Sequence, residues 1–175
     1  LEAMRDIPDG SVDMVLTDPP YGTTACKWDS VIPFEPMWEQ LKRVTKKNGA
    51  IVLFGSEPFS SALRLSNLRG YKYDWIWEKE QGTDFQLCKH KPLKNFEIAS
   101  VFNAKCVYSP QGLVLVNKKK KAKTDTLGHL AEKSKRDHIQ KYGNYPKQII
   151  KFNNQRGLHP TQKSGALMEY LIKTY

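Results

Sequence analysis

Short apolar runs alternate with amphipathic stretches in the amino-terminal part of the chain. Residues 12–17 form an apolar run that stops at Pro19-Pro20. Because proline cannot donate a hydrogen bond to a strand ladder, this run predicts a buried strand that ends there. Residues 34–47 predict a helix, which Asn48-Gly49 should end. The apolar face of this helix comprises Phe34, Met37, Trp38, Leu41 and Val44.

The same order of elements then repeats. Residues 50–54 predict a second buried strand. A second helix is expected from Pro58, which suits the first helical position, to about Leu68, with Gly70 as its stop. Strand, helix, strand and helix in succession imply parallel strands joined by right-handed crossovers. Residues 22–29 are polar and begin with glycine, which predicts a mobile loop after the first strand.

After Gly70 the spacing of apolar residues changes from helical to alternating. In residues 71–79, Tyr73, Trp75 and Trp77 share one face of a predicted strand. Residues 96–102 predict another strand, so the two form a hairpin-type pair added to the parallel sheet. Packing against the neighbouring strand is the favoured interpretation of Trp75.

The carboxyl-terminal part predicts less regular structure before its last helix. Residues 125–142 have helical character but lack a strong apolar stripe. A last helix should follow Lys163, with Ser164 as a candidate cap. Its apolar face comprises Leu167, Met168, Leu171 and Ile172.

Composition narrows the class of protein. The 175 residues suit one domain, and 39% hydrophobic with 26% charged residues exclude a disordered chain. No apolar run is long enough to cross a bilayer, so no membrane association is expected. Cys26, Cys88 and Cys106 are odd in number and widely spaced, which argues against a disulfide framework or a metal site and favours a reducing, cytoplasmic setting.

Positive charge is concentrated in one segment. Residues 105–158 contain 13 Lys and Arg but only 3 Asp and Glu, whereas the rest of the chain has 15 of each. This segregation predicts contact with nucleic-acid phosphates, the alternative being a solvated loop. The candidate contacts, some of them in a loop or hairpin tip at residues 118–121, are Lys118, Lys119, Lys120, Lys121, Lys123 and Arg156.

The tetrapeptide Asp18-Pro19-Pro20-Tyr21 directly follows the first strand. In open α/β sheets, ligands bind at the carboxyl ends of the strands. A carboxylate and the Pro19 carbonyl can each accept one N–H of an amino group, while Tyr21 can stack on the ring that carries it. These groups suit a planar amine; a proline turn that caps the strand, with Tyr21 covering the core, is the alternative.

Asp-Pro-Pro-Tyr after a strand resembles the catalytic motif of the DNA amino-methyltransferases, which use S-adenosylmethionine (SAM) to methylate adenine N6 or cytosine N4. The Asp form resembles the adenine-N6 branch, since the cytosine-N4 branch more often has Ser there. Asp18, Pro19, Pro20 and Tyr21 would then be the catalytic residues. The resemblance implies transfer to a flipped-out base in double-stranded DNA, without a metal and without a covalent enzyme intermediate.

A second motif, His159-Pro160-Thr161-Gln162-Lys163, resembles the cofactor-side signature of this family, with Ser164 where proline is usual. The order of the motifs resembles the permuted class, in which the catalytic half comes first. The resemblance implies that Asp18, His159, Thr161, Gln162 and Lys163 bind SAM, with His159 shaping the turn. Trp77-Glu78-Lys79 also resembles a family motif, though weakly. A polar helix start is the alternative for the second motif.

The resemblance implies a Rossmann-like methyltransferase sheet, mostly parallel with an antiparallel strand pair and a basic insert. It divides the chain into a catalytic half (1–104), a recognition segment (105–158) and the start of a cofactor half (159–175). The family's glycine-rich cofactor loop is not among the 175 residues, which implies a partial protein. The strand at 12–17 would then expose an apolar edge, so we expect marginal stability, self-association or completion by another segment.

The resemblance also implies a bacterial or phage-encoded cytoplasmic protein, a possible homodimer and a possible companion restriction nuclease. Other interpretations stay open at this point. They are a methyltransferase acting on cytosine N4, RNA or a protein amide, and a catalytically inactive nucleic-acid-binding module.

Overall fold

The computed structural model describes residues 1–24, 26, 29–120, 138–155, 157 and 162–175. They form two compact units, one of residues 1–109 and 148–175 and the other of residues 110–147. None of the helices in these ranges is long and apolar enough to cross a membrane.

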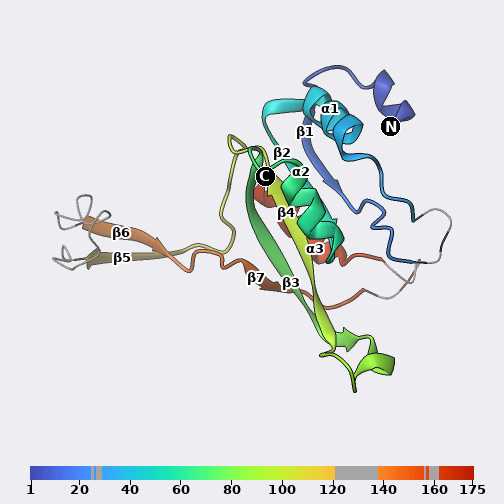
Figure 1. Ribbon diagram of the computed structural model, residues 1–175. Coiled ribbons are helices and arrows are strands. Elements are labelled where there is room, and N and C mark those ends of the chain that lie inside the picture. Colours follow the sequence, from blue (N-terminus) through green and yellow to red (C-terminus); the bar gives the residue numbers. More distant parts are fainter. Residues whose placement is uncertain (25, 27–28, 121–137, 156, 158–161) are drawn as a thin grey trace, which may run out of the picture. The chain divides into compact units, whose positions relative to one another are not determined.

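The first unit contains a five-stranded sheet in the order β1-β2-β4-β3-β7 (Figure 1). Strand β1 pairs parallel with β2, and β3 pairs parallel with β7, whereas β4 is antiparallel to both β2 and β3. Four strands therefore run in one direction and β4 runs against them, which confirms the mostly parallel sheet with an antiparallel pair. The strands are β1 (Val12–Thr17), β2 (Thr45–Gly55), β3 (Tyr71–Thr83), β4 (Lys94–Phe102) and β7 (Ile149–Lys151).

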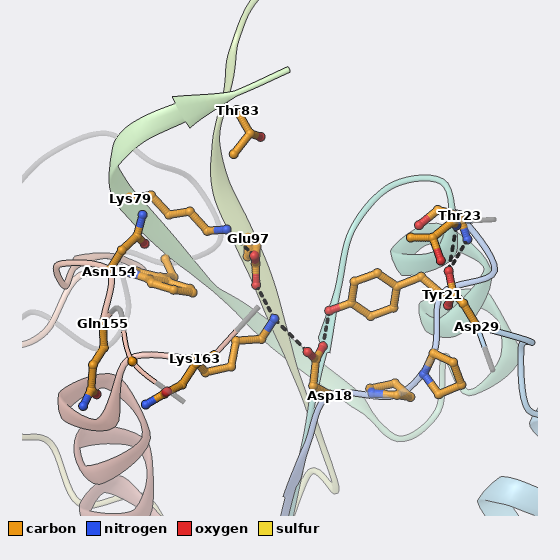
Figure 2. A pocket seen from close by; sticks show the side chains of 16 residues that line it. Asp18, Tyr21, Thr23, Asp29, Lys79, Thr83, Glu97, Asn154, Gln155 and Lys163 are labelled. Atoms are coloured by element: carbon orange, nitrogen blue, oxygen red, sulfur yellow. Dashed lines mark hydrogen bonds and ion pairs between the residues drawn. The ribbon is translucent and has the colours of Figure 1, made fainter. Parts of the chain in front are cut away.

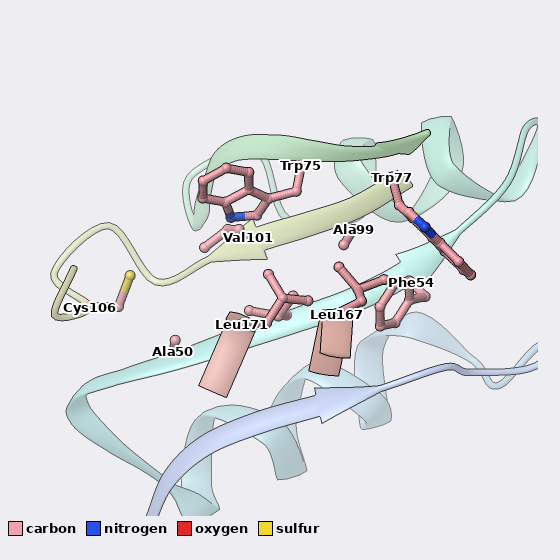
Figure 3. Packing of buried hydrophobic residues seen from close by; sticks show 10 residues of the cluster. Ala50, Phe54, Trp75, Trp77, Ala99, Val101, Cys106, Leu167 and Leu171 are labelled. Atoms are coloured by element: carbon pink, nitrogen blue, oxygen red, sulfur yellow. The ribbon is translucent and has the colours of Figure 1, made fainter. Parts of the chain in front are cut away.

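Helices cover both faces of this sheet. Helices α1 (Phe34–Val44) and α2 (Phe59–Ser66) pack on one face, where Ile51 and Leu53 of β2 point. Helix α3 (Gly165–Thr174) packs on the other face through Leu167 and Leu171 (Figure 3). Alternate residues of β2 thus serve two cores, as the period of a strand requires. Short 3-10 turns lie at Glu2–Asp6 and Phe85–Leu87.

The core opposite α1 and α2 is rich in tryptophan. Trp75 and Trp77 of β3 are each 3% exposed and pack with Ala99 and Val101 of β4, together with the α3 leucines (Figure 3). Each indole N–H is satisfied, since Trp75 Nε1 donates to the Tyr175 hydroxyl and Trp77 Nε1 donates to the Phe152 carbonyl, both at 2.8 Å. The shared face predicted for the aromatic residues of this strand is confirmed.

Two boundaries of the first helices differ from those predicted. Helix α1 ends at Val44, not at Lys47, and Asn48-Gly49 lies inside β2 at the irregular part of its pairing with β1. A Cβ on Gly49 would lie 2.5 Å from the Asp13 carbonyl oxygen, so this glycine permits close approach of two strands instead of ending a helix. Helix α2 begins at Phe59, directly after Pro58, and ends at Ser66.

Helix α3 buries a narrower face than predicted. Leu167 and Leu171 are buried and Met168 packs against them, but Ile172 is 60% exposed. Thr174 is buried instead, and its hydroxyl donates to the Tyr170 carbonyl at 2.7 Å. Because successive residues are about 100° apart around a helix, Ile172 lies outside the stripe that Leu167 and Leu171 form.

The second unit is an antiparallel ribbon of β5 (Val114–Lys120) and β6 (His138–Gly143). The helix expected over residues 125–142 is therefore wrong for residues 138–142, while residues 125–137 lie outside the described ranges. Lys118, Lys119 and Lys120 are on a strand and not in a loop. Their register partners on β6 are Gln140, Ile139 and His138, and this antiparallel pairing holds the three lysines in a strand.

Candidate active site

The carboxyl end of β1 opens onto a cleft of about 860 Å³ in the first unit. The proline pair ends the strand there, which places Asp18 and Tyr21 at the sheet edge where ligands of open α/β sheets bind. Both predicted motifs contribute to this cleft. Its walls are Asp18, Pro19, Pro20, Tyr21, Thr23, Thr24, Asp29, Trp77, Lys79, Thr83, Glu97, Asn154, Gln155, Gly157, Gln162 and Lys163.

Tyr21 has a structural role as well as a place in the cleft. Its ring stacks on Phe59 with the centroids 5.1 Å apart. Its hydroxyl donates a hydrogen bond to Oδ1 of Asp18 (Figure 2). Burial, reinforced by the bond to Asp18, raises the pKa of the Tyr21 hydroxyl far above its ordinary value, so the group stays a proton donor. The turn alternative is therefore correct in part, because Tyr21 does cover the core.

Asp29 fixes the first residues of the loop that follows the motif. Its carboxylate accepts backbone N–H bonds from Gly22 at 2.8 Å, Thr23 at 2.9 Å and Thr24 at 2.7 Å. Hydrogen bonds from Thr24, together with those from Gly22 and Thr23, lower the pKa of Asp29 to about 2. The loop expected to be mobile is thus anchored at its start, and Asp29 belongs to the wall of the cleft.

Lys163 brings the two motifs into contact. Its ammonium lies 2.8 Å from Oδ2 of Asp18 and 2.7 Å from Oε2 of Glu97 (Figure 2). The side chain is only 13% exposed and passes over the ring of Phe54, 5.3 Å from its centroid. Burial alone would lower the pKa of Lys163, but the carboxylates of Glu97 and Asp18 outweigh it and raise the pKa above 10.5. Lys163 is therefore a charged bridge between two acids.

Glu97 on β4 is the second acid of this bridge. It also forms an ion pair with Lys79 of β3, whose ammonium lies 5.0 Å from the ring centroid of Trp77. Burial alone would raise the pKa of Glu97, but the ammonium groups of Lys163 and Lys79 hold it below its ordinary value. A chain of alternating charges thus runs from Lys79 through Glu97 and Lys163 to Asp18.

Lys163 lies just before α3, and a hydrogen bond to the side chain of Gln155 fixes the first residue of this helix. Oε1 of Gln155 accepts the backbone N–H of Gly165 at 2.9 Å. Ser164 occupies the cap position with an extended backbone, but its side chain makes no cap hydrogen bond. The predicted cap position is therefore right, while Gln155 takes over the bonding role expected of the serine.

Comparison with known proteins identifies the family of this chain. A family model described as DNA methylase, of the N6/N4 methyltransferases, matches residues 12–175. The chain belongs to the N6/N4 DNA methylase family. The matched residues of this methylase include both motifs, and thus the two segments that meet in the cleft.

Three solved structures share its fold. The M1.HpyAVI–SAM complex is 21% identical with a TM-score of 0.57, covering 99% of this chain and 72% of that one. The PvuII DNA methyltransferase (cytosine-N4-specific) is 11% identical with a TM-score of 0.61, covering 98% of this chain and 66% of that one. A structure of M1.HpyAVI is 19% identical with a TM-score of 0.53, covering 99% and 68%. This methylase chain thus spans about two thirds of their length.

The structure brings together those residues of the two motifs that it describes. Asp18, Pro19, Pro20, Tyr21, Gln162 and Lys163 all line the one cleft. Lys118, Lys119 and Lys120 lie exposed on β5 in the second unit. Several predicted site residues lie outside the described ranges: His159, Thr161, Arg156, Lys121 and Lys123.

Sequence reasoning missed two acids of this cleft, Asp29 and Glu97, and gave little weight to a third residue. Asp29 and Glu97 stand in no motif that we recognised, and Lys79 was noted only within a weak one. A charged residue in the otherwise uncharged run 96–102 was the available signal for Glu97. Within the described ranges, no three His, Cys, Asp or Glu side chains converge as a metal ion requires; the metal-free reaction stays a prediction.

Proposed function

We propose that this chain forms the catalytic part of a methyltransferase that transfers a methyl group from SAM to the N6 amino group of adenine in double-stranded DNA. The contact of Lys163 with Asp18 at 2.8 Å carries the proposal, because it joins the catalytic-side motif to the cofactor-side motif in one cleft. Membership in the N6/N4 DNA methylase family supports the same chemistry.

Asp18 and Pro19 would hold the amino group of a flipped-out base. Oδ2 of Asp18 is held by Lys163, whereas Oδ1 accepts only the hydroxyl of Tyr21 among the bonds described (Figure 2). A base amine can replace that hydroxyl at Oδ1 and give its second proton to the Pro19 carbonyl. With both N–H bonds fixed, the nitrogen lone pair points away from them, so the contribution of the protein is orientation and electrostatics.

The cleft fits SAM in size and in charge. A volume of about 860 Å³ lies within the range of small-molecule sites. Lys79 and Lys163 offer cations for the carboxylate of the cofactor, and Asp18 offers an anion for its positive groups. When bound, SAM supplies a methyl group on a positively charged sulfur. Gln162 and Lys163 would hold its polar ends, and His159 and Thr161 would assist.

Double-stranded DNA is the proposed partner because the basic charge is segregated from a neutral body. Lys118, Lys119 and Lys120 on the β5–β6 ribbon would contact phosphates, with Lys121, Lys123 and Arg156 added from outside the described ranges. Such contacts fix position without reading sequence. A homodimer and a companion nuclease stay predictions.

The choice of adenine over cytosine depends on Asp18, because the cytosine-N4 branch more often has Ser at that place. Nucleoside analysis after transfer from labelled SAM to DNA by the full-length protein tests this choice. We expect N6-methyladenine. Label in N4-methylcytosine would contradict the base assignment while keeping the reaction class, and no label in either nucleoside would contradict both.

A further inference from the structure

We propose that Glu97 is a positioning residue for the transfer reaction, acting through Lys163 on the carboxylate of Asp18. This inference rests on the function proposed above. It assigns a role to a buried acid on β4 that belongs to neither motif.

Geometry gives Glu97 this role. Its side chain is 14% exposed, and its Oε2 lies 2.7 Å from the Lys163 ammonium, which in turn lies 2.8 Å from Oδ2 of Asp18 (Figure 2). Lysine has a flexible stem and three donors, so one carboxylate alone would not fix the direction of its ammonium. Two carboxylates on opposite sides of the ammonium do fix it.

A residue on the neighbouring strand β3 holds Glu97 in place. Lys79 of β3 forms an ion pair with its Oε1, and β4 runs between β2 and β3 in the middle of the sheet. Asp18, by contrast, follows a strand at the edge of the described sheet. The bridge therefore ties an acid on a loop to the central strand of the sheet, and such support from a regular element maintains a reactive geometry.

The charge of Lys163 depends on the same bridge. The groups that face its ammonium are Asp18 after β1, Glu97 on β4 and the ring of Phe54 on β2, with Lys79 and Tyr21 bonded to the two acids. Attraction by Glu97 is the largest influence that raises the pKa of Lys163, and burial opposes it. Removing the charge of Glu97 should lower that pKa, so the ammonium would deprotonate at a lower pH.

The test compares Glu97→Gln with Glu78→Gln in the full-length protein. Glu78 is the matched control, because it lies on β3 and, in the described part of the chain, pairs only with the exposed Lys151 at 3.2 Å. Glu97→Gln should lower the single-turnover transfer rate by about tenfold or more, with dissociation constants for SAM and DNA changed less than about threefold. Its alkaline loss of activity should begin at a lower pH than in wild type, whereas Glu78→Gln should match wild type in each measurement.

Conservative variants keep the test decisive if Glu97→Gln does not fold. Lys163→Arg retains a cation that can bridge two carboxylates, so it should keep more activity than Lys163→Met. Glu97→Asp retains the carboxylate, so it should keep more activity than Glu97→Gln, or should fold if Glu97→Gln does not. Equal rates and pH profiles for Glu97→Gln and Glu78→Gln would overturn the role of Glu97. A loss explained entirely by weaker SAM binding would also overturn it. Absence of transfer by wild type would instead overturn the proposed function.

Discussion

Trp75 donates its indole N–H to the hydroxyl of Tyr175 at 2.8 Å, and this hydroxyl also bonds to that of Tyr73 at 2.6 Å. The bond joins the buried face of β3 to the residue that follows α3. Since Lys163 stands shortly before the start of α3, the same helix is fixed at one end to the sheet and at the other to the cleft. The position of Lys163 therefore depends on packing as well as on charge.

Tyr175→Phe should destabilise the fold without changing the cleft. It removes the acceptor of the Trp75 N–H in a buried setting, which costs about 1–3 kcal/mol in the free energy of unfolding. Urea denaturation measures the change. Tyr145→Phe is the control, because Tyr145 is 55% exposed, and its substitution should leave the free energy within about 0.5 kcal/mol. Equal effects of the two substitutions would show that the Tyr175 hydroxyl contributes nothing specific.

Asp29→Asn should change how the free energy of unfolding depends on pH. The pKa of Asp29 is lowered in the fold from 3.8 to about 2, so its contribution is fully present above its unfolded pKa and is lost as the pH falls from 3.8 toward 2. Denaturation curves recorded between pH 5 and pH 2 should therefore converge for wild type and Asp29→Asn at the acid end. Curves that stay equally far apart at every pH would contradict the anchoring of Gly22, Thr23 and Thr24 by the charged form.

Tyr21 variants separate the ring from its hydroxyl. Tyr21→Ala removes the surface on which a flipped base can stack, an interaction of roughly 1–3 kcal/mol, so transfer should fall by about tenfold or more. Tyr21→Phe keeps the ring and its stacking on Phe59, so most activity should be retained. Single-turnover rates on one DNA substrate compare the two. Equal loss in Tyr21→Phe and Tyr21→Ala would mean that the hydroxyl, and not the ring, matters.

Neutral substitution of Lys118, Lys119 and Lys120 together should weaken DNA binding on every sequence. The slope of log affinity against log salt should flatten by about one unit for each phosphate that these lysines no longer neutralise. Titrations at several salt concentrations give this slope. The control neutralises the same number of charges near the end of α1, at Lys42, Lys46 and Lys47. If both sets flatten the slope equally, net charge and not binding at the β5–β6 ribbon accounts for the affinity.

Much of the first unit followed from the spacing of apolar residues. The buried strand β2 was predicted from its continuous apolar run, and the aromatic face of β3 was predicted from its period-two alternation. The end of α1 was predicted wrongly. A glycine such as Gly49 can end a helix or let two strands approach closely, and the sequence does not distinguish the two roles. The second unit is a short two-stranded ribbon whose side chains are mostly exposed, so its spacing of apolar residues was too weak to predict the two strands.

Part of the cleft could be predicted because its residues are adjacent in the chain. Asp18 to Tyr21 and Gln162-Lys163 form continuous motifs, and each of them lines the cleft. Glu97 and Asp29 could not be found in this way. Glu97 contacts Lys163, and Asp29 accepts hydrogen bonds from backbone N–H groups of the loop that follows Tyr21. These contacts form only in the folded chain, so the sequence alone does not indicate them.

Methyl transfer by Asp18→Ala, measured beside DNA binding in the full-length protein, tests the central claim most directly. Asp13→Ala is the control, because Asp13 lies on the same strand but its side chain is exposed and, among the described residues, pairs only with Lys46. Asp18→Ala should lower the transfer rate by on the order of 10²–10³-fold or more with little change in DNA affinity, whereas Asp13→Ala should retain the wild-type rate. Transfer by Asp18→Ala at the wild-type rate would contradict the assignment of this cleft as the active site.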